Sequence, residues 1–316
     1  MTVPADIDPT RFANHFASVR ETRLAYVREN PGGVPVVCVH GWPESKRIFW
    51  KVVEPLATAG FEVIVPDLRG FGDSELGADG FHDVVAHSHD IYELVHQVLG
   101  HERVVLVGGD LGGPIIQDLA LRHPEWVDRM VLFNSPLPYD KGLMAHLTGT
   151  RPAREASDYF IRQGTDPDGL AAELGTPEQR QRYIATFYTS RFWAHPGAFT
   201  APGEVDFHAE PFADEHKMRA SFGGYESSFN PATRSGIPLF ARNRHTRTLV
   251  LFGPSDHVIY PDFDRMAAIT FPKHVGPFLL RDCGHFVPWE APHALVSAMI
   301  AFASDLLVGA STSGRI

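Results

Sequence analysis

An aspartate stands between two pairs of glycines at residues 108–113, which read Gly-Gly-Asp-Leu-Gly-Gly directly after the apolar run Val104 to Val107. A short buried strand followed by a G-x-nucleophile-x-G frame predicts a sharp turn into a helix, with Asp110 raised at its apex. A carboxylate is a poor nucleophile toward amides and ordinary esters, but it can open a strained epoxide or displace a halide at saturated carbon. Asp110 is therefore predicted to attack an sp³ carbon and to form an ester with it.

Two further polar residues follow apolar runs later in the chain. Asp256 comes after the run Thr248 to Phe252, and His285 follows a second run that ends at Leu280. The order nucleophile, acid, histidine fits a triad in which Asp256 orients His285 and stabilises its imidazolium. Because an aspartate is normally ionised at neutral pH, His285 is predicted to act as the general base that activates water for hydrolysis of the ester.

Ester hydrolysis also needs two donors for the oxyanion that forms in the second step. The segment His40-Gly41-Trp42-Pro43 follows the apolar run Val34 to Val39, and Leu111 follows the nucleophile directly. We predict that the backbone N–H groups of Trp42 and Leu111 form this oxyanion hole.

Short β-branched runs alternate with longer helical patterns along most of the chain, which is typical of a mostly parallel sheet flanked by helices. The expected strands are Leu24–Arg28, Val34–Val39, Glu62–Pro66, Val104–Val107, Met130–Phe133, Thr248–Phe252 and Pro277–Leu280.

No run of this kind occurs between Asn134 and Thr246, where helix formers, aromatics and turn residues prevail. We predict an α/β fold with an inserted helical cap. The core is expected in residues 1–137 and 246–316, and the cap in residues 138–245.

The composition of the 316 residues restricts the possible partners and compartment. With 28 basic and 38 acidic residues the formal charge is -10, which disfavours nucleic acid and anionic membranes as partners. The two cysteines, Cys38 and Cys283, do not suggest a disulfide framework, and residues 1–12 contain no apolar run long enough for a signal peptide or a membrane span. The sequence predicts a cytoplasmic protein and gives no indication of its oligomeric state.

Five motifs in this order resemble the α/β-hydrolase superfamily and, within it, the soluble epoxide hydrolases. They are the segment His40-Gly41-Trp42-Pro43-Glu44-Ser45, the run Asp67-Leu68-Arg69-Gly70-Phe71-Gly72-Asp73-Ser74, the aspartate turn, Asp256 and the pair Gly284-His285. The resemblance covers nearly the whole chain. It implies an α/β-hydrolase fold and hydrolysis of a small apolar epoxide by water.

In members of this family two cap tyrosines donate hydrogen bonds to the epoxide oxygen. The resemblance assigns this role to Tyr159, which is followed by Phe160, and to Tyr225, which is preceded by Ser221-Phe222. The flanking Gly224 and Glu226 depart from the aromatic residue and the arginine that often surround the second tyrosine. Trp42, Phe160 and Phe222 are predicted to line the substrate pocket.

Two alternatives use the same scaffold. Haloalkane and haloacid dehalogenases share the aspartate, the histidine and the ester, but they solvate the departing halide with N–H donors. Leu111 offers no side-chain donor, whereas Trp42 does, and Leu111 and Pro114 stand where a haloacid dehalogenase would carry arginines. A noncatalytic ligand-binding protein of this fold is the second alternative, although such proteins usually lack a member of the triad.

Five histidines lie in residues 82–101, shortly before the run that leads to the nucleophile, namely His82, His87, His89, His96 and His101. We expect them on a solvated helix face, because no H-E-x-x-H motif and no cysteine pair with ligand spacing accompanies them. No metal is predicted. The chain also lacks a G-x-G-x-x-G motif and a phosphate-binding loop, so no cofactor is predicted either.

Overall fold

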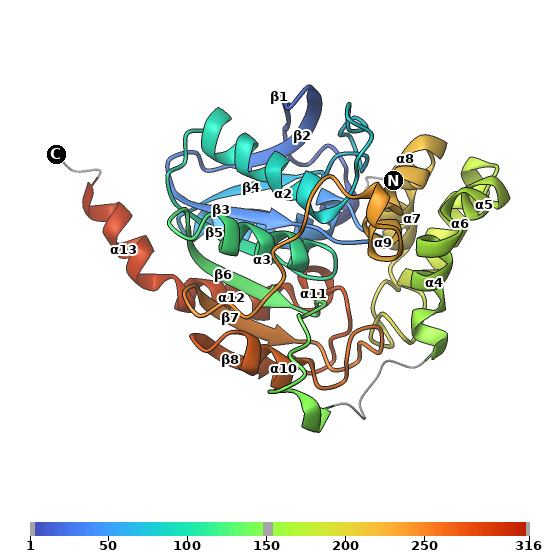
Figure 1. Cartoon of the computed structure of the whole chain (residues 1–316). Coiled ribbons are helices and arrows are strands. Elements are labelled where there is room, and N and C mark those ends of the chain that lie inside the picture. The colour runs from blue at the N-terminus through green and yellow to red at the C-terminus, as the bar shows by residue number, and fades with distance from the viewer. Residues whose placement is uncertain (1–3, 148–153, 314–316) are drawn as a thin grey trace.

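An eight-stranded sheet organises residues 4–147 and 154–313, which are the residues that the computed structural model describes (Figure 1). The strand order is β1-β2-β4-β3-β5-β6-β7-β8. The first three strands in this order pair antiparallel and the remaining pairs are parallel. The strands are β1 Asn14–Val19, β2 Thr22–Glu29, β3 Val34–Val39, β4 Phe61–Pro66, β5 Val104–Gly108, β6 Val127–Phe133, β7 Arg247–Phe252 and β8 His274–Leu279.

The predicted α/β-hydrolase fold class is confirmed, and every predicted strand run coincides with an observed strand apart from residue 280, which follows β8. Every residue of β4 and β5 is buried, as expected of parallel strands covered on both faces. The edge strand β1 was not predicted, because its sequence Asn-His-Phe-Ala-Ser-Val has few apolar residues and its side chains are mostly exposed. Both cysteines are buried and free.

Helices cover both faces of the sheet. α2 and α3 lie on the face nearer the viewer in Figure 1, and α11 and α12 lie behind the sheet. The helices that accompany the sheet are α1 Trp50–Thr58, α2 Val84–Tyr92, α3 Gly112–Arg122, α10 Phe263–Thr270, α11 Val287–Glu290, α12 Pro292–Phe302 and α13 Ser304–Ser313. Shorter turns are η1 Ala5–Ile7, η2 Lys46–Phe49, the π-helical η3 Glu93–Val98, η4 Ala145–Leu147, η5 Glu210–Phe212 and η6 Pro231–Thr233.

A second group of helices lies between β6 and β7 in the chain, where the described residues contain no strand. These are α4 Arg154–Thr165, α5 Pro167–Glu173, α6 Pro177–Tyr188, α7 Glu204–Ala209, α8 Glu215–Ser221 and α9 Gly223–Phe229. They gather beside the carboxyl ends of the parallel strands (Figure 1). The division into a core and a cap at residues 138–245 stays a prediction, and its residues 148–153 lie outside the described residues.

None of the described helices is long and apolar enough to cross a membrane.

Candidate active site

Asp110 occupies the turn between β5 and α3. Its φ of +42° lies in the left-handed region, which is uncommon for a residue other than glycine. The backbone N–H of Asp110 donates to the carbonyl of Asn134 at 2.9 Å and holds the turn against the end of β6. A side chain at Gly41 would place its Cβ 2.5 Å from that of Asp110, and one at Gly112 would meet the carbonyl oxygen of Val39 at 2.2 Å. These glycines are therefore required by close approach of the two loops.

His285 lies between two carboxylates. Its Nδ1 is 2.7 Å from Oδ2 of Asp256, and its Nε2 is 3.3 Å from Oδ2 of Asp110. The second contact is an ion pair without hydrogen-bond alignment, so Nε2 has no hydrogen-bond partner among the described residues. The three residues are 2 to 7% exposed. The structure thus brings together the three residues predicted to form a triad.

The charge state of His285 depends on these neighbours. Burial disfavours the imidazolium, but the carboxylates of Asp256 and Asp110 outweigh burial and hold the pKa of His285 well above its ordinary value. An ionised Asp110 therefore favours a protonated His285. Neutralisation of Asp110 would remove part of this stabilisation and lower the pKa of His285.

Asn134, at the end of β6, anchors the acid of the triad. Its Nδ2 is 2.9 Å from Oδ2 of Asp256 and within 3.1 Å of the carbonyl oxygens of Gly253 and Gly284. The backbone N–H of Val258 donates to the other carboxylate oxygen of Asp256 at 2.7 Å. The sequence analysis did not assign a role to Asn134, although its place after a strand that neighbours β7 was a usable signal.

The two predicted oxyanion donors come from different loops, one after β3 and one after β5. The backbone N–H of Trp42 donates to Oδ1 of Asp110 at 2.7 Å. Leu111 immediately precedes the first turn of α3, where backbone N–H groups lack partners within the helix. The structure therefore places one N–H on the carboxylate and leaves the oxyanion role of both groups as a prediction.

Glu44 is a second buried carboxylate near the nucleophile that the sequence analysis left without a role. Its Oε2 accepts a hydrogen bond from the backbone N–H of Gly41 at 2.5 Å, and its side chain is 5% exposed. Burial, together with the negative charge of Asp110, raises the pKa of Glu44 to about 7. Glu44 therefore titrates near neutral pH beside the nucleophile.

A cavity of about 610 Å³ opens onto Asp110, a volume typical of small-molecule sites. Tyr159 from α4 and Tyr225 from α9 line it together with the predicted pocket residue Phe160. Trp42 and Phe222 are fully buried and are not among the residues that line it, so their place in the substrate pocket stays a prediction.

Trp42 packs against both tyrosines. Its indole ring stacks on Tyr159 with ring centroids 5.4 Å apart and meets Tyr225 edge-on at 5.6 Å. Its Nε1 donates to Oγ of Ser221 at 3.2 Å. The one residue thus contacts the nucleophile through its backbone and both tyrosines through its ring.

The hydroxyls of Tyr159 and Tyr225 share the electrostatic field of Asp110. Removal from water, followed by the negative charge of Asp110, raises the pKa of each phenol well above its ordinary value. The buried hydroxyl of Tyr225 has no hydrogen-bond partner among the described residues. Both phenols are therefore protonated at neutral pH, and the hydroxyl of Tyr225 interacts with that of Tyr159 without an aligned hydrogen bond.

The predicted solvated face for the five histidines is wrong for His87. It lies on α2, is fully buried and packs against Phe71 with ring centroids 6.1 Å apart. The helix is covered there by the loop after β4, so this turn of α2 faces protein and not solvent.

Burial and the nearby Arg69 lower the pKa of His82 to about 4, and His82 is therefore neutral. Among the described residues no group of three or more possible ligands could hold a metal ion.

Comparison with known proteins fits this geometry. A model described as alpha/beta hydrolase fold matches residues 34–292, which is more than half of the chain. The chain belongs to this family. It is a hydrolase of the α/β family, and its similarity to soluble epoxide hydrolases is confirmed by a relative from Corynebacterium sp. (strain C12), a soluble epoxide hydrolase. That relative is 26% identical over 300 residues, which cover 94% of this chain and 99% of the relative.

Other relatives carry different names or show the fold alone. A cis-3-alkyl-4-alkyloxetan-2-one decarboxylase of Shewanella oneidensis is 25% identical over 311 residues, covering 93% of this chain and 89% of that protein. The solved structure of the epoxide hydrolase CorEH without ligand has a TM-score of 0.79 at 23% identity and covers 93% of this chain and 99% of its own. The family therefore contains more than one reaction.

Proposed function

We propose that the protein is an epoxide hydrolase that converts an epoxide to a vicinal diol through a hydroxyalkyl ester of Asp110. The observation that carries the proposal is that a carboxylate at the turn and the two tyrosines, Tyr159 and Tyr225, face the same cavity. A carboxylate suits attack on a strained carbon, and phenols suit protonation of the oxygen that leaves it. The soluble epoxide hydrolase among the relatives supports the same reaction.

In the first half-reaction an oxygen of Asp110 bonds to an epoxide carbon while the carbon–oxygen bond of the ring breaks. Tyr159 and Tyr225 donate hydrogen bonds to the epoxide oxygen. That oxygen takes a proton from one of the two phenols as it becomes a hydroxyl, and the phenol regains a proton from the solvent. The hydroxyl of Tyr225 is available for this contact, because it makes no aligned hydrogen bond with the described residues. The product is a neutral ester of Asp110.

In the second half-reaction His285 removes a proton from water, and the hydroxide adds to the carbonyl carbon of the ester. The N–H groups of Trp42 and Leu111 stabilise the resulting oxyanion. Collapse breaks the bond between the carbonyl carbon and the alkyl oxygen, restores the Asp110 carboxylate and releases the diol. One proton is returned overall, which balances the proton consumed in the first half-reaction.

The order of events follows from the pKa of His285. While Asp110 is a carboxylate, its charge helps to keep the pKa of His285 raised and the imidazolium favoured. Ester formation removes that charge, so the pKa of His285 falls and the imidazolium releases its proton to the solvent. The neutral imidazole can then accept a proton from water. Asp256, anchored by Asn134, keeps the ring in position throughout.

Dehalogenation is disfavoured by the surroundings of the nucleophile. The indole N–H of Trp42, which would be needed to solvate a halide, donates to Ser221 and does not face the cavity. Leu111 presents an aliphatic side chain to the cavity. A noncatalytic binding protein would have no need for a histidine held between two buried carboxylates.

The decisive experiment is mass spectrometry of the His285→Gln protein after incubation with separate panels of epoxides and haloalkanes. Without the base the ester should accumulate, and the peptide that contains Asp110 should gain the mass of an intact epoxide. An adduct from haloalkanes alone, with release of halide, would assign the protein as a dehalogenase. Absence of any adduct, together with absence of turnover by the wild-type protein, would support the noncatalytic alternative.

A further inference from the structure

A cation lines the otherwise largely apolar cavity. Arg234 follows η6 and contributes to the same cavity as Asp110 and Tyr225, with Pro238, Phe240 and Ile259 among the apolar neighbours. Arg234 is half-buried, whereas Asp110 is 7% and Tyr225 8% exposed. The guanidinium therefore lies nearer to solvent than the reacting groups.

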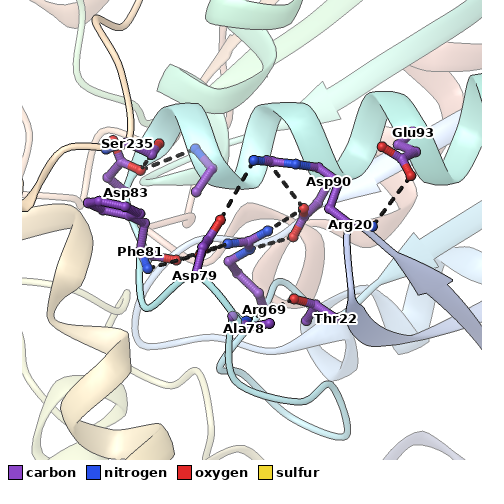
Figure 2. A network of polar contacts seen from close by, with 12 residues as sticks. Arg20, Thr22, Arg69, Ala78, Asp79, Phe81, Asp83, Asp90, Glu93 and Ser235 are labelled. Carbon is purple, nitrogen blue, oxygen red and sulfur yellow. Dashed lines mark hydrogen bonds and ion pairs between the residues drawn. The ribbon is translucent and has the colours of Figure 1, made fainter.

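Contacts on both sides hold this arginine in place. Its Nε donates to the carbonyl oxygen of Ser227 on α9 at 2.6 Å. The next residue, Ser235, donates to Asp83 through its backbone N–H at 3.1 Å and its hydroxyl at 2.6 Å, as Figure 2 shows. The same carboxylate caps α2 by accepting from the N–H of Ala86 at 3.1 Å. Arg234 is thus fixed to α9 by its side chain and to the core by its neighbour.

The remaining donors of Arg234 have no partner of their own. Its Nη1 and Nη2 make no hydrogen bond and no ion pair with the described residues, and Asp83, the other charged residue of the wall besides Asp110, is occupied by Ser235 and Ala86. The edge formed by Nη1 and Nη2 matches the two oxygens of a carboxylate. A cation placed near the mouth can bind such a group without the full cost of desolvation.

The geometry points to Arg234 as the receptor for a carboxylate on the substrate, which makes the substrate class an epoxide that carries an acid at the end remote from the ring. This inference rests on the proposed epoxide hydrolysis for the reactive end of the molecule. The apolar wall between the two polar ends would contact the aliphatic part. Because Asp110 is itself an anion, the carboxylate binds away from it, toward the partly exposed Arg234.

The test compares kcat/KM for ω-epoxyundecanoate and for its methyl ester, which differ in charge and share the reacting ring. The wild-type protein should prefer the acid by about 10- to 100-fold, as expected of a charge-assisted hydrogen bond. Arg234→Gln should abolish this preference, Arg234→Lys should retain part of it, and Arg244→Gln, at an exposed arginine outside the cavity wall, should keep it. Equal turnover of acid and ester by the wild-type protein would overturn the inference, as would an unchanged preference in Arg234→Gln.

A binding experiment separates this inference from the proposed reaction. Titration calorimetry with undecanoate and undecanamide, which cannot react, should show tighter binding of the carboxylate to the wild-type protein and no difference in Arg234→Gln. If this pattern appears while no epoxide is hydrolysed, the carboxylate receptor stands and the proposed function fails. If epoxides are hydrolysed but undecanoate and undecanamide bind alike, the carboxylate receptor fails and the proposed function stands.

Discussion

The two sides of the cavity satisfy their polar groups in different ways. On one side a core group, Asp110, Asp256, His285 and Asn134, is joined by hydrogen bonds and ion pairs between 2.7 and 3.3 Å long. On the other side the tyrosine pair, Tyr159 and Tyr225, is positioned by ring packing, and the hydroxyl of Tyr225 has no partner among the described residues.

This difference separates the tasks that the two sides would perform. Buried groups that carry a charge at some stage of the reaction need fixed partners, because an unpaired buried charge is costly. Groups that act only on a substrate oxygen need free donors aimed at the place where charge develops. The comparison therefore predicts that changes in the core group and changes in the tyrosine pair will differ in the step they affect and in the sign of their effect on stability.

The strongest test of the core group is Asp110→Asn. Removal of the nucleophile should lower kcat roughly 10⁴-fold or more, as for other members of catalytic triads. Folding should be preserved, because asparagine tolerates the left-handed conformation at this turn. The matched control is Asp168→Asn, at a side chain that is 86% exposed. Mass spectrometry must first show that the introduced asparagine has not deamidated to aspartate. A loss of kcat smaller than about 10⁴-fold in such protein would contradict the assignment of Asp110 as the nucleophile.

The tyrosine pair is tested by Tyr159→Phe and Tyr225→Phe in single-turnover kinetics. Each change should slow ester formation by about 10²- to 10³-fold, since one preorganised donor is lost. Hydrolysis of the ester, once formed, should keep its rate. Tyr183→Phe is the control, because its hydroxyl contacts Gln163 and does not line the cavity. Equal slowing of both half-reactions would remove the proposed division between the two sides.

Glu44→Gln tests whether the buried carboxylate beside the core group lowers the stability of the folded protein. The raised pKa means that the folded protein binds a proton that the unfolded chain releases, so stability is lost as pH rises from about 4.5 to about 7. Above pH 7 the full cost is on the order of 3 kcal/mol, by the usual conversion of a pKa shift to free energy. Chemical denaturation across this pH range should show the loss in the wild-type protein and not in Glu44→Gln. A parallel pH dependence in both proteins would place the cost elsewhere.

Asn134→Ala should destabilise the protein by about 2 kcal/mol, because it leaves several buried acceptors without their donor. The free energy of unfolding from urea titration measures this effect. Gln117→Ala, which removes a single hydrogen bond to Pro136, should cost less. A smaller loss for Asn134→Ala than for Gln117→Ala would show that Asn134 does not support the core group.

Tyr225→Phe should leave stability unchanged or raise it by up to about 1 kcal/mol, because it removes a buried hydroxyl without a partner among the described residues. A change in the free energy of unfolding opposite in sign to that of Asn134→Ala would sharpen the contrast between the two sides. A clear destabilisation, measured by the same titration, would mean that this hydroxyl is satisfied in the folded protein in solution.

Much of the fold and the central residues of the site could be predicted because their signals are local. Asp110, Asp256 and His285 each follow an apolar run, and such a run predicts a buried strand from its own residues alone. The roles of Asn134 and Arg234 depend on contacts that no local pattern reports. Asn134 bonds to Gly253, 119 positions away, and Arg234 enters the cavity wall from a segment with no motif.

The wrong prediction for His87 also arises from contacts that no local pattern reports. His87 belongs to an amphipathic pattern with polar neighbours, and its burial depends on a loop that arrives from β4. Phe222 and Trp42 are aromatic residues close in sequence to predicted site residues, yet both are fully buried and neither is among the residues that line the cavity. Sequence indicates which residues are apolar, whereas the tertiary fold decides whether an apolar side chain meets a ligand or another ring.

The contacts of Trp42 couple the position of the nucleophile to that of the two tyrosines. Its amide holds the nucleophile and its indole supports both tyrosines, so displacement at one end is transmitted to the other. A bulky substrate that pushed the tyrosines outward would strain the same residue whose amide is proposed to stabilise the tetrahedral intermediate. We therefore expect substrate size to affect the rate of ester hydrolysis as well as the binding of the epoxide. The protein would then discriminate between substrates a second time, after the ester has formed.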